Sequence, residues 1–344
     1  MSVETAAPDA LVRALGRFTT VPADLARYET SAHTAAQALR ATPEQVLQLA
    51  GAGLPHRDDP ELGPLFDYDD VMNVGMFCGT GQTVPELGLR FLMRFAGSSG
   101  HSWFEPREWE VGVHPARTAG SVVGSGSAGD SGSAARADLP AVTARVPDFA
   151  APGVTGLSPA FDAPLLAGGY RAEVRLDGAR HEVRDRRILA AWDDVVGPLT
   201  AREVVYQTVP EVLRADHDRA WRLGVVDCIV ASRLLAQRLR AEGFEARARR
   251  GYLLGLFGSD HAWCEVVEDG VAKSLDPVFA FVATVGDERG VKESPEFAAA
   301  CRGSRFNRLL PCVTDDAEPL VYFDGEPAPY WAMAGVSARP RRTP

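Results

Sequence analysis

The chain has 344 residues, of which 46% are hydrophobic and 24% charged, and its formal net charge at pH 7 is -10. This length suits one large or two medium-sized domains with a substantial core. The acidic balance argues against a general nucleic-acid-binding surface, so we expect small-molecule or protein partners and no nucleic acid.

The cysteines and the hydropathy indicate where the protein works. Five cysteines are scattered without the spacing of a disulfide framework, which is typical of reduced thiols in the cytoplasm. The N-terminal residues do not resemble a secretory signal, and the sequence has no run of about 18 apolar residues that would span a bilayer. We therefore expect a cytoplasmic protein without membrane contact. Its oligomeric state does not follow from the sequence.

Residues 1–115 are expected to form a mostly helical region. Residues 42–45 (TPEQ) have the pattern of a capping box with proline at the first helical position, which predicts a helix ending near Gly51. A second helix is predicted over 85–96, where apolar residues recur at helical spacing. The role of this region is not evident from its residues.

The composition changes after this region. Residues 116–160 are rich in Gly, Ser, Ala and Pro, which predicts either a flexible linker or a mobile loop that covers a site. Residues 161–334 are expected to form a second domain, and residues 335–344 a disordered tail.

A helix that begins at Cys228 is the first element with chemical content. Apolar residues recur at helical spacing from Ile229 to Leu239, and Gly243 ends the pattern. Asp227 has the residue type and position of an N-cap. Because unpaired N–H groups and the positive end of the helix dipole face the first turn, they favour the thiolate form of a cysteine placed there.

A strand around His261 comes next. From His261 to Val266, Ala262, Cys264 and Val266 alternate with His261, Trp263 and Glu265. This period of two predicts a half-buried strand with His261 facing a cleft and Cys264 facing the core. A loop from Val267 to Gly270 would return the chain in a register that pairs His261 with Asp276. Directly opposed residues bring their Cβ atoms within about 5 Å, close enough for a carboxylate to orient an imidazole.

Cys228, His261 and Asp276 together predict the thiol, base and orienting carboxylate of acyl transfer. Each residue alone also fits a structural role: a buried cysteine, a core histidine, or an aspartate in an Asp-Pro turn. Only the combination indicates catalysis.

Three segments carry a resemblance to a known family: DCIVASRLLAQRLRAEGFEARARRGY, DHAWCEV and LDP. In this order and spacing they resemble the core of the transglutaminase-like superfamily, over roughly residues 165–285. The resemblance implies an α+β, papain-like fold in which the helix of Cys228 packs on an antiparallel sheet carrying His261 and Asp276. It also makes 161–334 the catalytic domain and implies a thioester on Cys228 whose acyl group passes to an amine or to water.

Three functions stay open. The first is an acyltransferase that makes or exchanges an amide bond, in a biosynthetic pathway, on a small-molecule, peptide or carrier-bound acyl substrate. The second is a cysteine peptidase or amidase of the same fold, and the third is a non-catalytic binding protein with a relic triad. No cofactor and no metal are expected, because the sequence has no CxxC pair and no complete nucleotide-binding motif.

Three other features of the sequence are weaker indications of function. Cys78 and His101 form a thiol and imidazole pair without an aspartate context, and a buried or loop cysteine is the default interpretation of Cys78. The backbone N–H of Cys228 would donate to an oxyanion, with Gln207 or Trp221 as further donors. The basic run containing Arg247, Arg249 and Arg250 either binds an acidic partner or forms a solvated strand edge.

Overall fold

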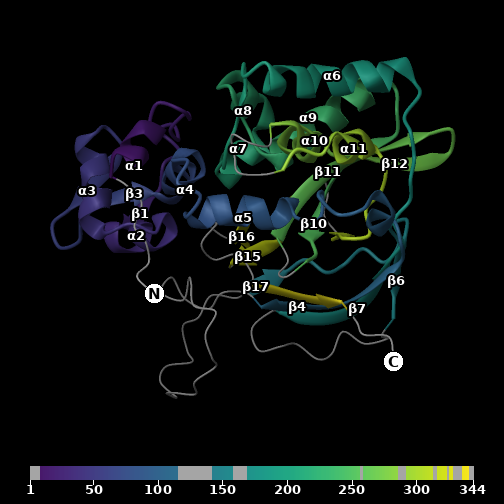
Figure 1. Cartoon of the computed structure of the whole chain (residues 1–344), viewed down its shortest axis with the longest axis horizontal. Helices are drawn as coiled ribbons and strands as arrows, with labels where there is room; N and C mark the ends of the chain where they lie inside the picture. Colours follow the sequence, from purple (N-terminus) through teal and green to yellow (C-terminus); the bar gives the residue numbers. More distant parts are fainter. Residues whose placement is uncertain are drawn as a thin grey trace. The chain divides into compact units, whose positions relative to one another are not determined.

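The structure is a computed structural model. It describes residues 8–114, 142–157, 169–255, 259–285, 292–312, 316–323, 325–327 and 335–340. The fold is α+β, as the sequence predicts, with helices and mainly antiparallel sheets (Figure 1). In the ranges given, no helix has both the length and the apolar character needed to cross a bilayer.

The contacts divide the chain into two units, each assembled from three separate stretches. The first unit comprises Met1–Trp103, Ala179–Ala248 and Ala262–Arg305, and the second comprises Phe104–Gly178, Arg249–His261 and Phe306–Pro344. These boundaries differ from the consecutive domains expected from the sequence, because strands distant along the chain pair within each unit.

The N-terminal part of the first unit is mostly helical, with a small sheet in the order β1-β3-β2 that the sequence analysis missed. Its elements are α1 (Pro8–Ala14), β1 (Tyr28–Ser31), α2 (Ala32–Leu39), α3 (Pro43–Gly51), β2 (His56–Asp59), β3 (Gly63–Asp67), α4 (Tyr68–Phe77), α5 (Val84–Met93) and the 3-10 turn η1 (Gly100–Trp103).

Both predicted helices of this part are present. The predicted capping box of α3 forms between Thr42 and Gln45. The helix α5 begins earlier than predicted, behind a second capping box between Thr83 and Glu86, and ends at Met93. Local cap chemistry therefore decides where both helices begin.

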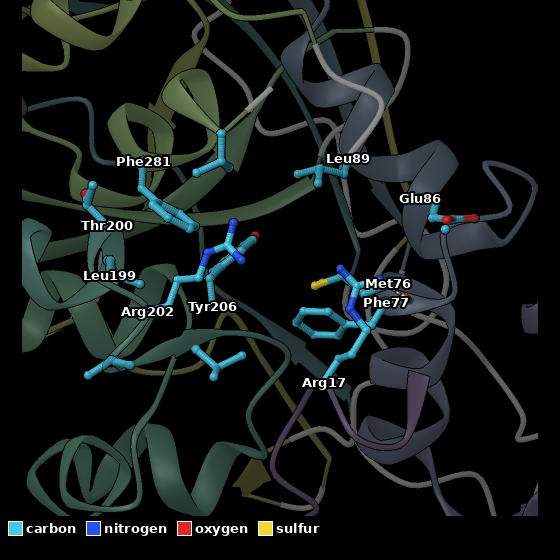
Figure 2. Close-up of a pocket in the computed structure, with 14 residues that line it drawn as sticks. Arg17, Met76, Phe77, Glu86, Leu89, Leu199, Thr200, Arg202, Tyr206 and Phe281 are labelled. Carbon is cyan, nitrogen blue, oxygen red and sulfur yellow. Dashed lines mark hydrogen bonds between the residues drawn. The ribbon is translucent and has the colours of Figure 1, made fainter. Parts of the chain in front are cut away.

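The remaining elements of the first unit include the helix of Cys228. They are α6 (Arg186–Thr200), β8 (Val205–Tyr206), α7 (Glu211–Ala215), α8 (His217–Arg222), β9 (Val225–Val226), α9 (Cys228–Ala241), β12 (Val271–Leu275), α10 (Pro277–Thr284), α11 (Pro295–Ala300), β13 (Arg302–Gly303) and the part of β11 (Ser259–Glu268) that follows His261. The helix α9 buries its apolar face against α6, α8 and α10. A cavity of about 270 Å³ lies in this unit, lined by residues of α4, α5, α6, β8 and α10 (Figure 2).

The hairpin of β11 and β12 has a different register from the predicted one. Cys264 pairs with Leu275, and Glu268 pairs with Val271. The turn contains only Asp269 and Gly270, both with positive φ (54° and 75°), as in a type I′ turn. The predicted pairing of His261 with Asp276 is therefore wrong by two residues.

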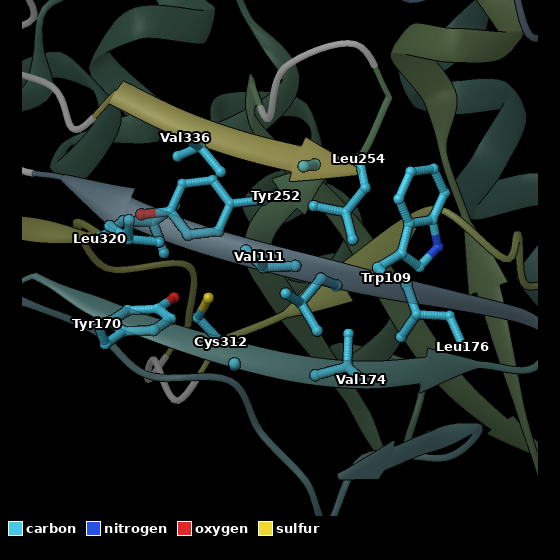
Figure 3. Packing of buried hydrophobic residues seen from close by; sticks show 14 of the residues in the cluster. Trp109, Val111, Tyr170, Val174, Leu176, Tyr252, Leu254, Cys312, Leu320 and Val336 are labelled. Atoms are coloured by element: carbon cyan, nitrogen blue, oxygen red, sulfur yellow. The ribbon is translucent and has the colours of Figure 1, made fainter. Parts of the chain in front are cut away.

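Antiparallel sheets build the second unit. Its elements are β4 (Arg107–His114), β5 (Val142–Ala144), β6 (Val154–Gly156), β7 (Tyr170–Leu176), β14 (Leu309–Pro311), β15 (Val321–Phe323), β16 (Glu326–Pro327), β17 (Gly335–Pro340) and the end of β10 (Ala246–Leu253), which pairs with β14. Strands β17, β4, β7 and β6 are neighbours in that order. Buried side chains including Trp109, Val111, Val174 and Tyr252 form one core cluster in this unit (Figure 3).

Two expectations about irregular segments need correction. Residues 335–340, expected to belong to a disordered tail, form β17 and pair with β4, with Val336 and Ala338 buried. Apolar residues alternate with Ser337 and Arg339 here, and this period of two is typical of a strand with one buried face. Within the predicted linker or loop 116–160, residues 142–157 contain β5 and β6, whereas 116–141 and 158–160 lie outside the described residues.

Candidate active site

Cys228 occupies the first position of α9, as predicted. Asp227 has extended backbone angles, and its Oδ1 accepts hydrogen bonds from the N–H groups of Ile229 (3.0 Å) and Val230 (2.9 Å). The preceding strand β9 lies parallel to β8, where the N–H of Gln207 donates to the carbonyl oxygen of Val226 at 3.0 Å. The strand and the capped helix therefore fix the backbone of Cys228 from both sides.

Exposure distinguishes Cys228 from the other thiols. All five cysteines lie in the described residues; Cys228 has intermediate exposure, and the other four are buried. Burial raises the pKa of Cys78, Cys301 and Cys312. Cys228 is therefore the thiol most accessible to a substrate.

Cys78 does not form a second candidate site. It ends α4 as the C-cap residue, and its thiol donates to the carbonyl oxygen of Gly75 at 3.3 Å. Because the C-terminal end of a helix carries the negative end of the dipole, this position disfavours a thiolate. The interpretation of Cys78 as a buried structural cysteine is confirmed.

Asp227 also takes part in a buried ion pair. Its Oδ2 lies 2.6 Å from Nε of Arg214, and the two side chains are only 6% and 9% exposed. Arg214 also pairs with Glu211, through Nη1 and Oε2 at 3.0 Å. One carboxylate thus caps α9 and balances a buried guanidinium, so the start of α9 depends on α7.

The N-terminal helix α4 contributes acidic groups near this ion pair. Burial raises the pKa of Asp69 to about 7, and the nearby Arg214 opposes that rise. Asn73 of α4 holds the backbone of Thr208, accepting from its N–H at 2.8 Å and donating to its carbonyl oxygen at 3.1 Å. The N-terminal region is therefore anchored on the segment that leads into α7.

The two side chains expected as further oxyanion donors, Gln207 and Trp221, both make other contacts. The side-chain amide of Gln207 donates to the carbonyl oxygen of Thr19 at 2.7 Å and accepts from its N–H at 3.0 Å. Trp221 lies in α8 with the guanidinium of Arg238 5.3 Å from its ring centroid. Gln207 therefore holds the N-terminal segment in place, a role that the sequence did not indicate.

Asp276 is the N-cap of α10 and is 2% exposed. Its Oδ1 accepts from the N–H of Phe279 at 3.0 Å, and its own N–H donates to the carbonyl oxygen of Cys301 at 2.9 Å. Because α10 packs against α9, Asp276 and Cys228 begin two helices that are in contact within the first unit.

His261 is a buried residue of β11, 5% exposed, and belongs to the second unit. The strand continues into the first unit at Ala262, and Cys264 is fully buried, as predicted. The cooperation of His261 with Cys228 and Asp276 stays a prediction from the sequence.

The basic run on β10 is not a solvated edge. Arg249 pairs with Asp148 at 2.6 Å, and Arg250 pairs with Asp260 at 2.6 Å. These four side chains are at most 18% exposed, whereas Arg247 is exposed. Both buried arginines are thus engaged in ion pairs within the second unit.

A metal centre has no support in the described part of the chain, which contains no cluster of three or more His, Cys, Asp or Glu side chains suited to hold an ion.

Comparisons with known proteins give one distant structural likeness. No family model matches the chain, and no curated protein matches it. Among solved structures, a putative cysteine protease from Cytophaga hutchinsonii is similar at 12% sequence identity and a TM-score of 0.36, over 70% of this chain and 92% of that one. At this TM-score the likeness assigns neither a family nor an activity.

Proposed function

We propose that the protein is a transglutaminase-like acyltransferase that makes or exchanges an amide bond through a thioester on Cys228. The observation that carries the proposal is the solvent exposure of the cysteines. Cys228, at the start of α9, is partly exposed, and the other four cysteines are buried. An accessible thiol at a helix N-terminus is the setting of a nucleophilic cysteine.

In the proposed mechanism, His261 accepts the thiol proton of Cys228, and Asp276 orients the imidazole. The thiolate then attacks the acyl carbonyl, and protonated His261 donates its proton to the leaving group as the thioester forms. An amine attacks the thioester, releases the amide and restores the thiol. The N–H groups of Ile229 and Val230 already donate hydrogen bonds to Asp227. We therefore assign the role of oxyanion donor to the N–H of Cys228.

Site-resolved alkylation tests the nucleophile. The protein is treated with iodoacetamide across a pH series, and each cysteine peptide is quantified by mass spectrometry. We expect Cys228 to be alkylated fastest at neutral pH, and His261→Ala to slow its alkylation at least tenfold at that pH.

A second histidine provides a matched control. His217 contacts α9 through Gln237 (2.9 Å) and Arg233 (3.2 Å), so His217→Ala perturbs the same helix without removing the proposed base. The variant should leave the alkylation of Cys228 unchanged. If Cys228 reacts at the same rate in the wild type and in His261→Ala, the catalytic proposal fails and the relic-site alternative replaces it.

A further inference from the structure

Several buried apolar side chains line the cavity of the first unit. Phe77, Leu89, Leu199 and Phe281 are all less than 10% exposed and line it. Tyr206 completes one wall, with its ring centroid 6.2 Å from that of Phe281 at an interplanar angle of 70°. The volume of about 270 Å³ is close to the lower end of the range for small-molecule sites.

Two arginines give this cavity a positive rim. Figure 2 shows Arg17 and Arg202 on opposite sides of the cavity. Nη1 of Arg17 donates to the carbonyl oxygen of Phe77 at 2.9 Å, which fixes this guanidinium beside Phe77 at the edge of the cavity. The carboxylate of Glu86, which also lines the cavity, is instead committed to Thr80 (3.0 Å) and the backbone of Thr83 (3.1 Å). The two guanidinium groups outnumber this carboxylate, so the lining of the cavity has a net positive charge in a chain whose net charge is -10.

The backbone of Arg202 decides which substitutions can test its side chain. Its φ is 61°, in the left-handed region that favours glycine, directly after the last turn of α6. The turn is closed by hydrogen bonds from Arg202 N–H to Leu199 (3.2 Å) and from Glu203 N–H to Pro198 (2.9 Å). Glycine is the usual residue at this position, so Arg202 can be replaced by glycine without backbone strain.

We propose that this cavity binds a small organic anion with a flat apolar body. The body would pack between Phe77, Tyr206 and Phe281, because aromatic rings favour edge and offset contacts with one another. The anionic group would lie between Arg17 and Arg202, since a guanidinium matches the two oxygens of a carboxylate.

The cavity shares a strand pair with the candidate active site. Tyr206 pairs with Val226, two residues before Cys228. The inference concerns binding alone and stands whether or not Cys228 is catalytic.

Binding of 2-naphthoate, followed by ligand-observed NMR titration, tests the proposal. A ligand of about 13 non-hydrogen atoms with ordinary ligand efficiency binds with a dissociation constant of about 1 mM. The neutral isostere 2-naphthamide should bind at least about fivefold more weakly, because it lacks the charge that a guanidinium recognises.

Glycine substitutions provide a matched pair of variants. Arg202→Gly removes the guanidinium but fits the left-handed backbone, so the fold should be retained. Arg40→Gly is the control: Arg40 also has a left-handed backbone at a helix end (φ 52°), is exposed, and does not line the cavity. Arg202→Asn repeats the test with a side chain that tolerates this conformation.

We expect Arg202→Gly and Arg202→Asn to weaken 2-naphthoate binding at least about fivefold and Arg40→Gly to leave it unchanged. Thermal melting of each variant reports whether the fold is intact. The proposal is overturned if the wild type does not bind 2-naphthoate, if 2-naphthamide binds equally well, or if Arg40→Gly weakens binding as much as Arg202→Gly.

Discussion

Substitution of Asp227 tests whether the start of the candidate nucleophile helix depends on a buried ion pair. Asp227→Ala removes the N-cap acceptor of Ile229 and Val230 and the carboxylate that faces Arg214. Loss of an N-cap typically costs about 1 kcal/mol, and removal of one partner from a buried ion pair costs about 3–5 kcal/mol. Because Glu211 still pairs with Arg214 in the variant, the lower end of that range applies, and we expect the free energy of unfolding to fall by about 4 kcal/mol.

Two variants separate these contributions. Asp227→Asn keeps an oxygen that caps α9 but loses the charge beside Arg214, so it should show most of the loss. Asp185→Ala is the matched control, because Asp185 also caps a helix and pairs with an arginine, Arg187, but at a surface where the two side chains are 27% and 57% exposed.

Urea titration followed by circular dichroism measures all three variants. Asp185→Ala should lose less than half as much stability as Asp227→Ala, because exposed ion pairs contribute little. Equal losses at the two positions, or full stability in Asp227→Asn, would refute the reasoning about the buried pair.

Two further predictions concern acidity and close packing. Burial raises the pKa of Asp70 from 3.8 to about 8, so its stabilising contribution is complete below pH 4 and is lost as pH rises through 8, by at most about 1.4 kcal/mol per pH unit. Urea titrations at several values from pH 5 to 7 measure this effect. The free energy of unfolding should fall less steeply with rising pH in Asp70→Asn than in the wild type. In Asp218→Asn, where the residue replaced is exposed, it should fall as steeply as in the wild type. Gly251→Ala should lower the melting temperature sharply, because a Cβ there would collide with the backbone of Leu310, whereas Gly88→Ala in α5 has open space and should raise it. A Gly251→Ala protein as stable as Gly88→Ala would contradict the pairing of β10 with β14.

Local signals were sufficient for the helix that begins at Cys228 and for the strand that contains His261. The start of α9 at Cys228 follows from an aspartate cap and an apolar face, which act within a few residues. The strand through His261 is present as predicted, but its predicted half-buried character is wrong, because residues 261–264 are all buried. A capping box likewise placed the start of α3.

The register of the hairpin failed for a specific physical reason. A shift by two residues leaves every side chain of β12 on the same face, so alternation could not distinguish the predicted pairing from the observed pairing of Cys264 with Leu275. The Asp269-Gly270 dipeptide was the available signal, because it favours a two-residue turn.

Contacts between residues that are distant in sequence could not be predicted from local patterns. Arg249 and its partner Asp148 are 101 residues apart, and Gln207 holds the backbone of Thr19 across 188 residues. Such pairs arise only when the chain folds, so the sequence could not distinguish a buried arginine from a solvated one. The cavity beside β8 likewise joins α4, α5, α6 and α10 and has no linear motif.

The central claim is that Cys228 carries an acyl group. Incubation with p-nitrophenyl acetate, followed by rapid acid quench and peptide mass spectrometry, measures this directly, with and without ethylamine as acceptor. We predict an acetyl adduct on Cys228 that hydroxylamine removes, that is absent in Cys228→Ala, and that ethylamine consumes to form N-ethylacetamide. Release mainly as acetate in the presence of ethylamine would favour the peptidase or amidase, and no adduct on Cys228 would contradict the account.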